Sequence, residues 1–239
     1  MKIKILFLFT AVVVLFSCSK KESNTEIFGS VKGLKKGTLY LERVIDTNLV
    51  TIDSLVINGN PEFSFNIDLE SPEVIYLFLK KSEGNILPDR LDIFAEPGKI
   101  EVQTTLKDFE TGAKVTGSTN HDKLKEYHNL MQKYNDKSLE LLQESFESKK
   151  VQNEERLSKL ETQMQSLVRN KYLATVNFAL NNKDYEIAPY LAISEIFDAN
   201  IKYLDTIYTS LPEKNKISTY GKELEKFIAE RKQIEKSQE

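Results

Sequence analysis

The stretch TGSTNHDKL, residues 116–124, divides the chain into two halves of different composition. Eight of the nine glycines lie at or before Gly117, and only Gly221 follows. Glycine favours turns and weakens the interior of a helix. The first half should therefore be rich in turns, and the second half should be helical.

The same stretch carries signals for the start of a helix. Ser118, Thr119 and Asn120 are all good N-cap residues, and Thr119 with Asp122 resembles a capping box. After it, apolar and polar side chains recur at alternating spacings of three and four, which predicts one stripe of a long helix. That stripe consists of Leu124, Tyr127, Met131, Tyr134, Ser138 and Leu141.

The clearest strand pattern of the first half is EFSFNIDL, residues 62–69. Its two phenylalanines, Ile67 and Leu69 fall on one face, and polar side chains fall on the other. An alternation with a period of two is typical of a strand with one buried face. The run VIYLFLK, residues 74–80, is apolar throughout, which predicts a strand covered on both faces.

Together with these two, about seven or eight short runs rich in β-branched and aromatic residues precede residue 117. The run RLDIFAEPGKIEVQTT, residues 90–105, predicts a hairpin that turns at the residues EPGK. Short strands with frequent turns favour an antiparallel β-sandwich or a partly open barrel. We therefore predict an α+β fold, with a β domain over residues 26–117 and an α-helical domain over residues 118–239.

The apolar spacing in the second half predicts five helices, of which the first two form a long helical hairpin. The second helix follows the charged segment ESKKVQNEE, residues 147–155, and carries Leu157, Leu160, Met164, Leu167 and Lys171 on its stripe. Shorter helices are expected around Pro189, before Pro212 and after it. The two long helices should pack against each other inside the chain, although a partner chain would also fit their stripes.

The N-terminus has the pattern of a bacterial lipoprotein. The run from Ile5 to Phe16 is apolar except for Thr10 and follows two lysines, and it is too short for a confident membrane span. The motif LFSC places Cys18 where a lipobox has its acylated cysteine. We expect residues 1–17 to be a signal peptide and residues 18–25 a tether; a plain secretory signal with a stray thiol is the alternative.

Composition excludes several classes of function. Loss of Lys2 and Lys4 with the leader lowers the formal net charge from −3 to −5, and the absence of a basic block argues against nucleic acid as a partner. Cys18 is the only cysteine, so the sequence has no internal disulfide, CxxC pair or thiolate metal site. We expect no cofactor and no metal.

Few residues suggest chemistry. His121 and His128 lie two helical turns apart, too far to share a metal readily, and are expected to be solvated. Carboxylates that gather at the predicted hairpin could serve a hydrolase, but solvated strand faces and turns explain them better. They are Asp89, Asp92, Glu96 and Glu101. Four aromatic residues could line a ligand groove, although core packing is the commoner role. They are Phe63, Phe65, Tyr76 and Phe78.

Several motifs, in this order, resemble a known family. They are FGSVKGLKKGTLYLER, LVINGNPEFSFNIDLESPEVIYLFL, IFAEPGKIEV and KVTGSTNHDKLKEY. The order resembles domain of unknown function 4369, over roughly residues 26–120, in lipoproteins of Gram-negative bacteria. APYLAISEIF and KISTYGKELEKFI resemble the helical connector that leads to a thioredoxin-like domain in those proteins. The sequence here ends at Glu239 without a CxxC, so no catalytic residue carries over.

These observations lead to one main hypothesis and one alternative. The main hypothesis is a non-enzymatic binding or scaffolding lipoprotein of the cell envelope, held in the outer membrane by its lipid and facing the periplasm or the cell surface. The resemblance suggests an envelope protein as a partner, with thiol-disulfide proteins among the candidates. The alternative is a receptor for a glycan, peptide or lipid, bound in a cleft between sheet and helices.

The lipid anchor gives a direct prediction. When cells are labelled with a fatty-acid analogue, the wild-type protein should carry the label and the Cys18→Ala variant should not, because Cys18 is the only thiol that can be acylated. The measurement is fluorescence of the labelled protein after gel separation. Label retained on Cys18→Ala would rule the anchor out.

Overall fold

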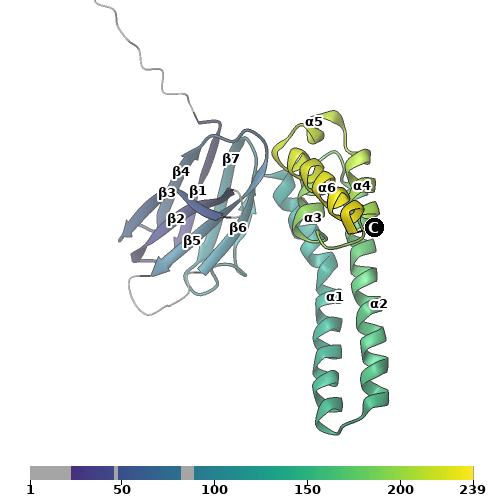
Figure 1. Cartoon of the computed structure of the whole chain (residues 1–239). Helices are drawn as coiled ribbons and strands as arrows, with labels where there is room; N and C mark the ends of the chain where they lie inside the picture. Colours follow the sequence, from purple (N-terminus) through teal and green to yellow (C-terminus); the bar gives the residue numbers. More distant parts are fainter. Residues whose placement is uncertain (1–22, 46–47, 82–88, 239) are drawn as a thin grey trace, which may run out of the picture.

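The structure is a computed structural model that describes residues 23–45, 48–81 and 89–238 (Figure 1). The predicted leader and Cys18 lie outside the described residues. The strands are β1 (Thr25–Lys32), β2 (Lys36–Ile45), β3 (Asn48–Asn58), β4 (Glu62–Ile67), β5 (Glu73–Lys81), β6 (Asp89–Ala95), β7 (Gly98–Thr105) and β8 (Lys114–Thr116). The helices are α1 (Thr119–Lys150), α2 (Glu154–Asn181), α3 (Ile187–Ser194), α4 (Ile201–Ser210), α5 (Glu213–Lys216) and α6 (Thr219–Gln238).

The strands form two sheets of four strands, in the orders β4-β1-β7-β8 and β3-β2-β5-β6. Side chains from both sheets form one buried core, so the sheets pack face to face as a sandwich. The α+β prediction is confirmed. β4 alternates exposed and buried residues along its whole length, as the period of two predicted, and Phe63, Phe65 and Ile67 point into the core.

One pair of strands departs from the antiparallel pattern. β1 and β7 run parallel, in a register that pairs Ile27 with Ile100 and Gly29 with Val102. A Cβ atom at Gly29 would overlap the carbonyl group of Val102. Glycine is therefore required for the close approach of these two strands.

The predicted hairpin at residues 90–105 is wrong. β6 pairs with β5, whereas β7 pairs with β1 and β8 in the other sheet. The residues between them carry the chain across the edge of the sandwich. Turn residues such as Pro97 and Gly98 are equally compatible with a hairpin and with a corner between two sheets, so the local sequence does not distinguish them.

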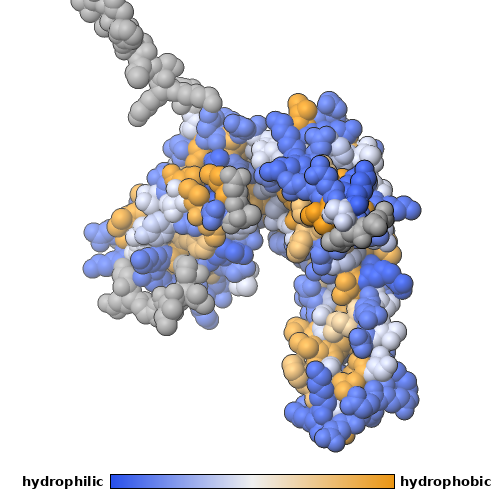
Figure 2. All heavy atoms as spheres, viewed as in Figure 1, coloured by the Kyte–Doolittle hydropathy of each residue, from blue (hydrophilic) through white to orange (hydrophobic). Residues whose placement is uncertain are grey.

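The helical half begins with the predicted long hairpin, which projects away from the sandwich (Figure 1). Leu141 of α1 and Leu160 of α2 are buried between the two helices. The turn uses Gln152 at a φ of 51°. Figure 2 shows apolar side chains on the surface near the free end of this hairpin, where four are exposed. They are Leu139, Leu142, Phe146 and Val151.

A third cluster of buried side chains, which we call the interface cluster, joins the sandwich to the helices. It contains Val74 of β5 and Phe94 of β6, and it continues into α1 and α3. Its helical members are Leu124, Tyr127, Met131, Ile187 and Leu191. β5 therefore contacts the sandwich core through Ile75 and the helices through Val74, which confirms for this end of the strand the prediction of a strand covered on both faces.

Ser118 ties the first turn of α1 to β6. Its hydroxyl accepts a hydrogen bond from the backbone N–H of His121 at 3.0 Å and donates one to the carbonyl of Phe94 at 2.6 Å. The N-cap is thus Ser118, and the predicted capping box of Thr119 and Asp122 is not formed. Ser118 is preferred because its hydroxyl also satisfies a buried carbonyl of the neighbouring strand.

Glu96 completes this junction from the end of β6. Its carboxylate accepts from the backbone N–H groups of Thr119 at 2.8 Å and Asn120 at 3.3 Å, and from the side-chain amide of Asn120 at 2.8 Å. The side-chain oxygen of Asn120 then accepts from the N–H of Ile187, the first residue of α3, at 3.1 Å. A negative charge at a helix N-terminus is favoured by the helix dipole.

The junction predicts an asymmetric response to two glutamate substitutions. Glu96→Ala should lower the free energy of unfolding by about 1–3 kcal/mol, because several N–H groups near the helix start lose a charged acceptor. Glu101→Ala is the matched control, since the Glu101 carboxylate accepts from the Gln103 side chain on the sheet surface, and it should cost less than about 0.5 kcal/mol. Urea unfolding followed by circular dichroism measures both; equal losses would contradict the assignment.

Candidate functional site: a cleft between the sheet and the helices

A cavity of about 420 Å³ lies where β5 meets α3 and α6, and we call it the cleft. Tyr76 and Val74 line it from β5, Tyr190 and Ile193 from α3, and Tyr220 from the start of α6. Val44, Glu73, Ser194, Thr219 and Glu223 complete its lining. A concave, largely apolar pocket with a few polar groups is the usual form of a ligand site.

Aromatic rings form one side of the cleft. The ring centroids of Tyr190 and Tyr220 lie 5.2 Å apart, and each ring contacts Phe94 edge-on, at 5.3 Å and 6.0 Å. Burial raises the pKa of both tyrosines above the ordinary value of 10. Both hydroxyls therefore stay protonated at neutral pH. That of Tyr220 accepts a hydrogen bond from the N–H of Val74 at 2.8 Å.

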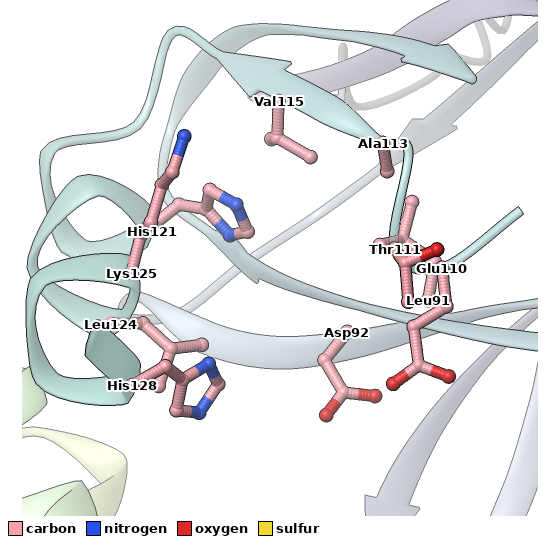
Figure 3. A pocket seen from close by; sticks show the side chains of 10 residues that line it. All are labelled: Leu91, Asp92, Glu110, Thr111, Ala113, Val115, His121, Leu124, Lys125 and His128. Atoms are coloured by element: carbon pink, nitrogen blue, oxygen red, sulfur yellow. The ribbon is translucent and has the colours of Figure 1, made fainter. Parts of the chain in front are cut away.

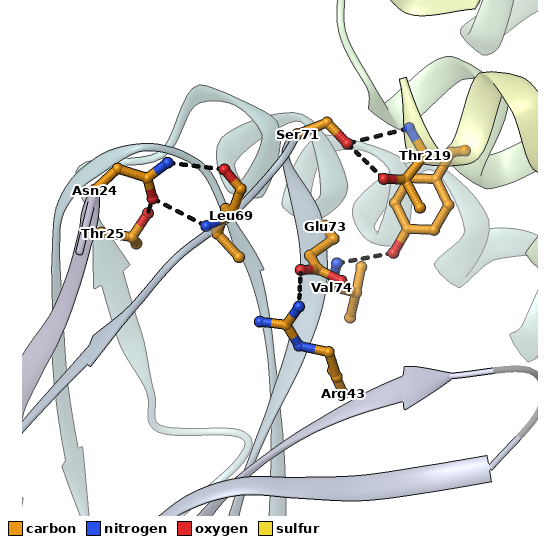
Figure 4. Close-up of polar contacts among 9 residues, drawn as sticks. Asn24, Thr25, Arg43, Leu69, Ser71, Glu73, Val74 and Thr219 are labelled. Carbon is orange, nitrogen blue, oxygen red and sulfur yellow. Dashed lines mark hydrogen bonds and ion pairs between the residues drawn. The ribbon is translucent and has the colours of Figure 1, made fainter. Parts of the chain in front are cut away.

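Hydrogen bonds fix the rim of the cleft (Figure 4). The Ser71 hydroxyl donates to the Thr219 hydroxyl at 2.8 Å and accepts from the Thr219 N–H at 3.1 Å.

At the first described residues of the chain, the Asn24 amide donates to the carbonyl of Leu69 at 2.8 Å and accepts from its N–H at 3.0 Å. Asn24 and Thr25, which the sequence pattern assigns to the end of the tether, are therefore part of the fold in this structure.

A second cavity, of about 600 Å³, adjoins the cleft and shares Val44, Glu73, Thr219 and Glu223 with it. We call it the adjoining pocket. Its lining adds Asn24, Arg43, Ile45, Asp68, Leu69 and Glu70. The Glu73 carboxylate forms an ion pair with the Arg43 guanidinium at 3.1 Å. Burial, with smaller contributions from Glu223 and Glu70, nevertheless raises the pKa of Glu73.

The two histidines lie together in a separate cavity of about 250 Å³ (Figure 3). Asp92 and Glu110 lie on its opposite side, and Lys125 lies beside the histidines. Within the described residues, no group of three or more histidine, aspartate or glutamate side chains is arranged to hold a metal ion. His128 is exposed, as predicted.

His121 is not the solvated residue that we expected. It is half-buried, and its Nδ1 atom accepts a long hydrogen bond of 3.4 Å from the N–H of Phe94. That acceptor exists only in the neutral imidazole. Burial lowers the pKa of His121 below its ordinary value of 6.5. His121 is thus a structural part of the junction between β6 and α1.

The structure separates the four aromatic residues that were candidates for one groove. Phe63 and Phe65 are buried in the sandwich core, with ring centroids 5.9 Å apart, and do not line the cleft. Tyr76 does line it. Phe78 lies two residues further along β5, half-buried, with its ring 6.4 Å from that of Tyr76. The alternating pattern of β4 pointed to a buried face, and burial excludes a ligand there.

The four carboxylates of the predicted hairpin do not face one site. Asp89 forms an ion pair with Lys81, and Asp92 forms one with Arg90 beside the histidine cavity. Glu96 binds the start of α1, and Glu101 accepts from a surface glutamine. Because each has a local partner on a different part of the sandwich, this set gives no support to a pair of catalytic carboxylates.

No sequence pattern indicates that Tyr190, Tyr220 and Glu73 meet. Tyr220 is on a predicted helical stripe, and Val74, whose N–H it binds, lies 146 residues earlier. Tyr190 follows Pro189 in a segment that is apolar on most sides, so its position resembled that of any core residue. Only the packing of α3 and α6 on β5 brings these residues to one cavity.

Comparison with known proteins supports the resemblance in the N-terminal region. A family model described as Domain of unknown function (DUF4369) matches residues 25–124. Residues 25–124 are thus identified as this domain, as the motifs predicted. The match includes β1 to β8 and the first turn of α1, so it contains the junction of Glu96, Ser118 and Asn120. A search of curated proteins found no match.

The lowered pKa of His121 predicts a pH dependence of stability. Below about pH 6.5 the unfolded chain takes up a proton at this residue before the folded chain does, so the free energy of unfolding should fall as the pH is lowered from 7 to 5. His121→Asn keeps an acceptor near the Nδ1 position and should show a shallower fall. Urea unfolding at several pH values measures the difference.

Two features isolate the effect of His121. The variant keeps Glu73, whose raised pKa acts in the opposite direction, so that contribution cancels in the comparison. His128→Asn is the matched control, because His128 is exposed on the same helix. An identical pH dependence in wild type and His121→Asn would show that this histidine is not coupled to folding.

Proposed function

We propose that the protein is a lipid-anchored, non-catalytic binding module of the cell envelope, attached to the outer membrane, and that the cleft is its binding surface. The cleft itself is the observation that carries the proposal. It combines three tyrosine rings, apolar side chains and a small number of polar groups in one concavity between two domains. This favours the receptor alternative over a purely structural role.

The position of the cleft relative to the predicted anchor supports the same proposal. Asn24 lines the adjoining pocket and lies only six residues after Cys18. An extended chain spans at most about 3.5 Å per residue, so a lipid on Cys18 would hold Asn24 within ~20 Å of the membrane surface. None of the helices among the described residues is long and apolar enough to cross a membrane.

Rigidity of the walls also supports binding. The N–H of Val74 is held by Tyr220, and Ser71 is held by Thr219, so β5 and α6 are fixed to each other beside the cleft. A preformed site loses less conformational entropy when it takes up a ligand than one that must first close.

A scaffold for another envelope protein is the second candidate. The exposed apolar side chains near the free end of the hairpin favour it, because apolar side chains that cluster on a protein surface often form contacts with a partner protein. The family resemblance makes a thioredoxin-like protein the first partner to test.

Methyl NMR on the soluble protein, expressed without residues 1–18, tests the cleft as the binding surface. Fractions of an envelope extract should shift the signals of Val44 and Ile193, which line the cleft, and leave those of Leu91 and Leu124, which line the histidine cavity, in place. Shifts at the histidine cavity alone, or at no methyl group in any fraction, would contradict the proposal.

A matched pair of variants sharpens this test. Val44→Trp should fill the mouth of the cleft. The envelope fraction that shifts the Ile193 methyl signals in the wild type should bind this variant at least 10-fold more weakly, as measured by the same signals. Val56→Trp introduces the same side chain on β3 at a residue that is 73% exposed and outside both cavities, and it should leave binding unchanged. Equal binding by both variants would place the ligand elsewhere.

A further inference from the structure

The charges around the cleft are of one predominant sign. Among the residues that the structure describes, four carboxylates line the cleft and the adjoining pocket, and Arg43 is the one cationic side chain in the two linings. The carboxylates are those of Asp68, Glu70, Glu73 and Glu223. Both Glu73 and Glu223 line both cavities, so the negative charge reaches the tyrosine-lined cleft itself.

Glu73 is largely enclosed and forms an ion pair. Its side chain is 14% exposed, and Arg43 lies on one side of it at 3.1 Å. The Arg43 side chain is 23% exposed, and it lines the adjoining pocket but not the cleft. In a partly desolvated cavity, an incoming positive charge interacts with such carboxylates more strongly than it would at an open surface.

The aromatic wall complements a cation as well. The faces of tyrosine rings attract ammonium and guanidinium groups. The protein already makes one such contact at the edge of the cleft, where the guanidinium of Arg90 lies 5.0 Å from the centre of the Tyr76 ring. The apolar side chains Val44 and Ile193 lie in the same cavity and can pack against a hydrocarbon stem.

We propose that the cleft binds an organic cation, an ammonium or guanidinium group on an apolar stem, with the charge near Glu73 and Glu223 and the stem against the tyrosine rings. This inference rests on the proposed function, since it names the ligand class of the same cleft. A free amine and a lysine or arginine side chain of a peptide carry this same chemistry. The same carboxylates would repel an anionic ligand, which excludes an anion as the ligand of the cleft.

Three probes test the inference by methyl NMR at Val44 and Ile193. They are the peptide acetyl-Ala-Lys-Ala-amide, its analogue with norleucine in place of lysine, and the free diamine cadaverine. The lysine peptide should bind at least 10-fold more tightly than the norleucine peptide, and its affinity should fall with added salt, because exposed charges are screened. Binding of cadaverine as well would identify a free amine as sufficient; binding of the peptide alone would identify a basic segment of a protein.

Substitutions on α6 provide the control. Glu223→Gln removes one charge from an exposed position in the cleft and should weaken binding of the lysine peptide about 3-fold or more without loss of the fold. Glu230→Gln, on the same helix but outside both cavities, should have no effect. Glu73→Gln should weaken binding further, with circular dichroism to confirm that loss of the Arg43 ion pair leaves the fold intact.

Two results would overturn the inference while leaving the proposed function to its own test. The first is equal binding of the lysine and norleucine peptides, which would show a cleft that selects shape rather than charge. The second is no shift at Val44 or Ile193 with any cationic probe while an envelope fraction still shifts them. If neither probes nor fractions act on the cleft, both proposals fail together.

Discussion

The carboxylate of Glu96 at the start of α1 is the contact on which the arrangement of the molecule depends. It lies at the end of β6, where the chain leaves one sheet for the other, and it binds two backbone N–H groups of the helix. The Ser118 hydroxyl donates a hydrogen bond to the carbonyl of Phe94, and the side-chain oxygen of Asn120 accepts one from the first residue of α3. One short segment thus fixes a strand and two helices relative to one another.

This junction also determines that a cleft exists. α1 is held against β6, and α3 is held through Asn120, so α3 packs beside Val74 of β5 and Phe94 of β6. α6 then packs on α3 and returns to β5 through Tyr220. The cleft is the space that remains between these two fixed connections. Its shape follows from hydrogen bonds that are distant in sequence.

The difference between what sequence could and could not predict follows from the range of the interactions. The strand β4 and the stripes of α1 and α2 were predictable, because burial imposes a period of two or of about 3.6 on the residues themselves. The crossing at Pro97 and Gly98 was not, because the same turn residues serve a hairpin and a corner. Glu96 was counted among surface carboxylates, since nothing near it in sequence shows that a helix start lies beside it. Tyr190 and Tyr220 lie on α3 and α6, and only the packing of these helices on β5 brings both rings to one cavity with Glu73.

Glu73 and Glu186 show why a shifted pKa alone does not locate a site. Burial raises the pKa of Glu186 as well as that of Glu73. The Glu186 carboxylate, however, accepts a hydrogen bond from the Ser218 hydroxyl at 2.7 Å and lies at the start of α3, where a negative charge stabilises the helix. Glu73 has an arginine partner, yet it faces two cavities and two further carboxylates. The same shift therefore accompanies a structural contact in one place and an open, negatively charged cavity in the other. The cavity and the tyrosine rings that line it, rather than the pKa shift, make the position of Glu73 suitable for a ligand.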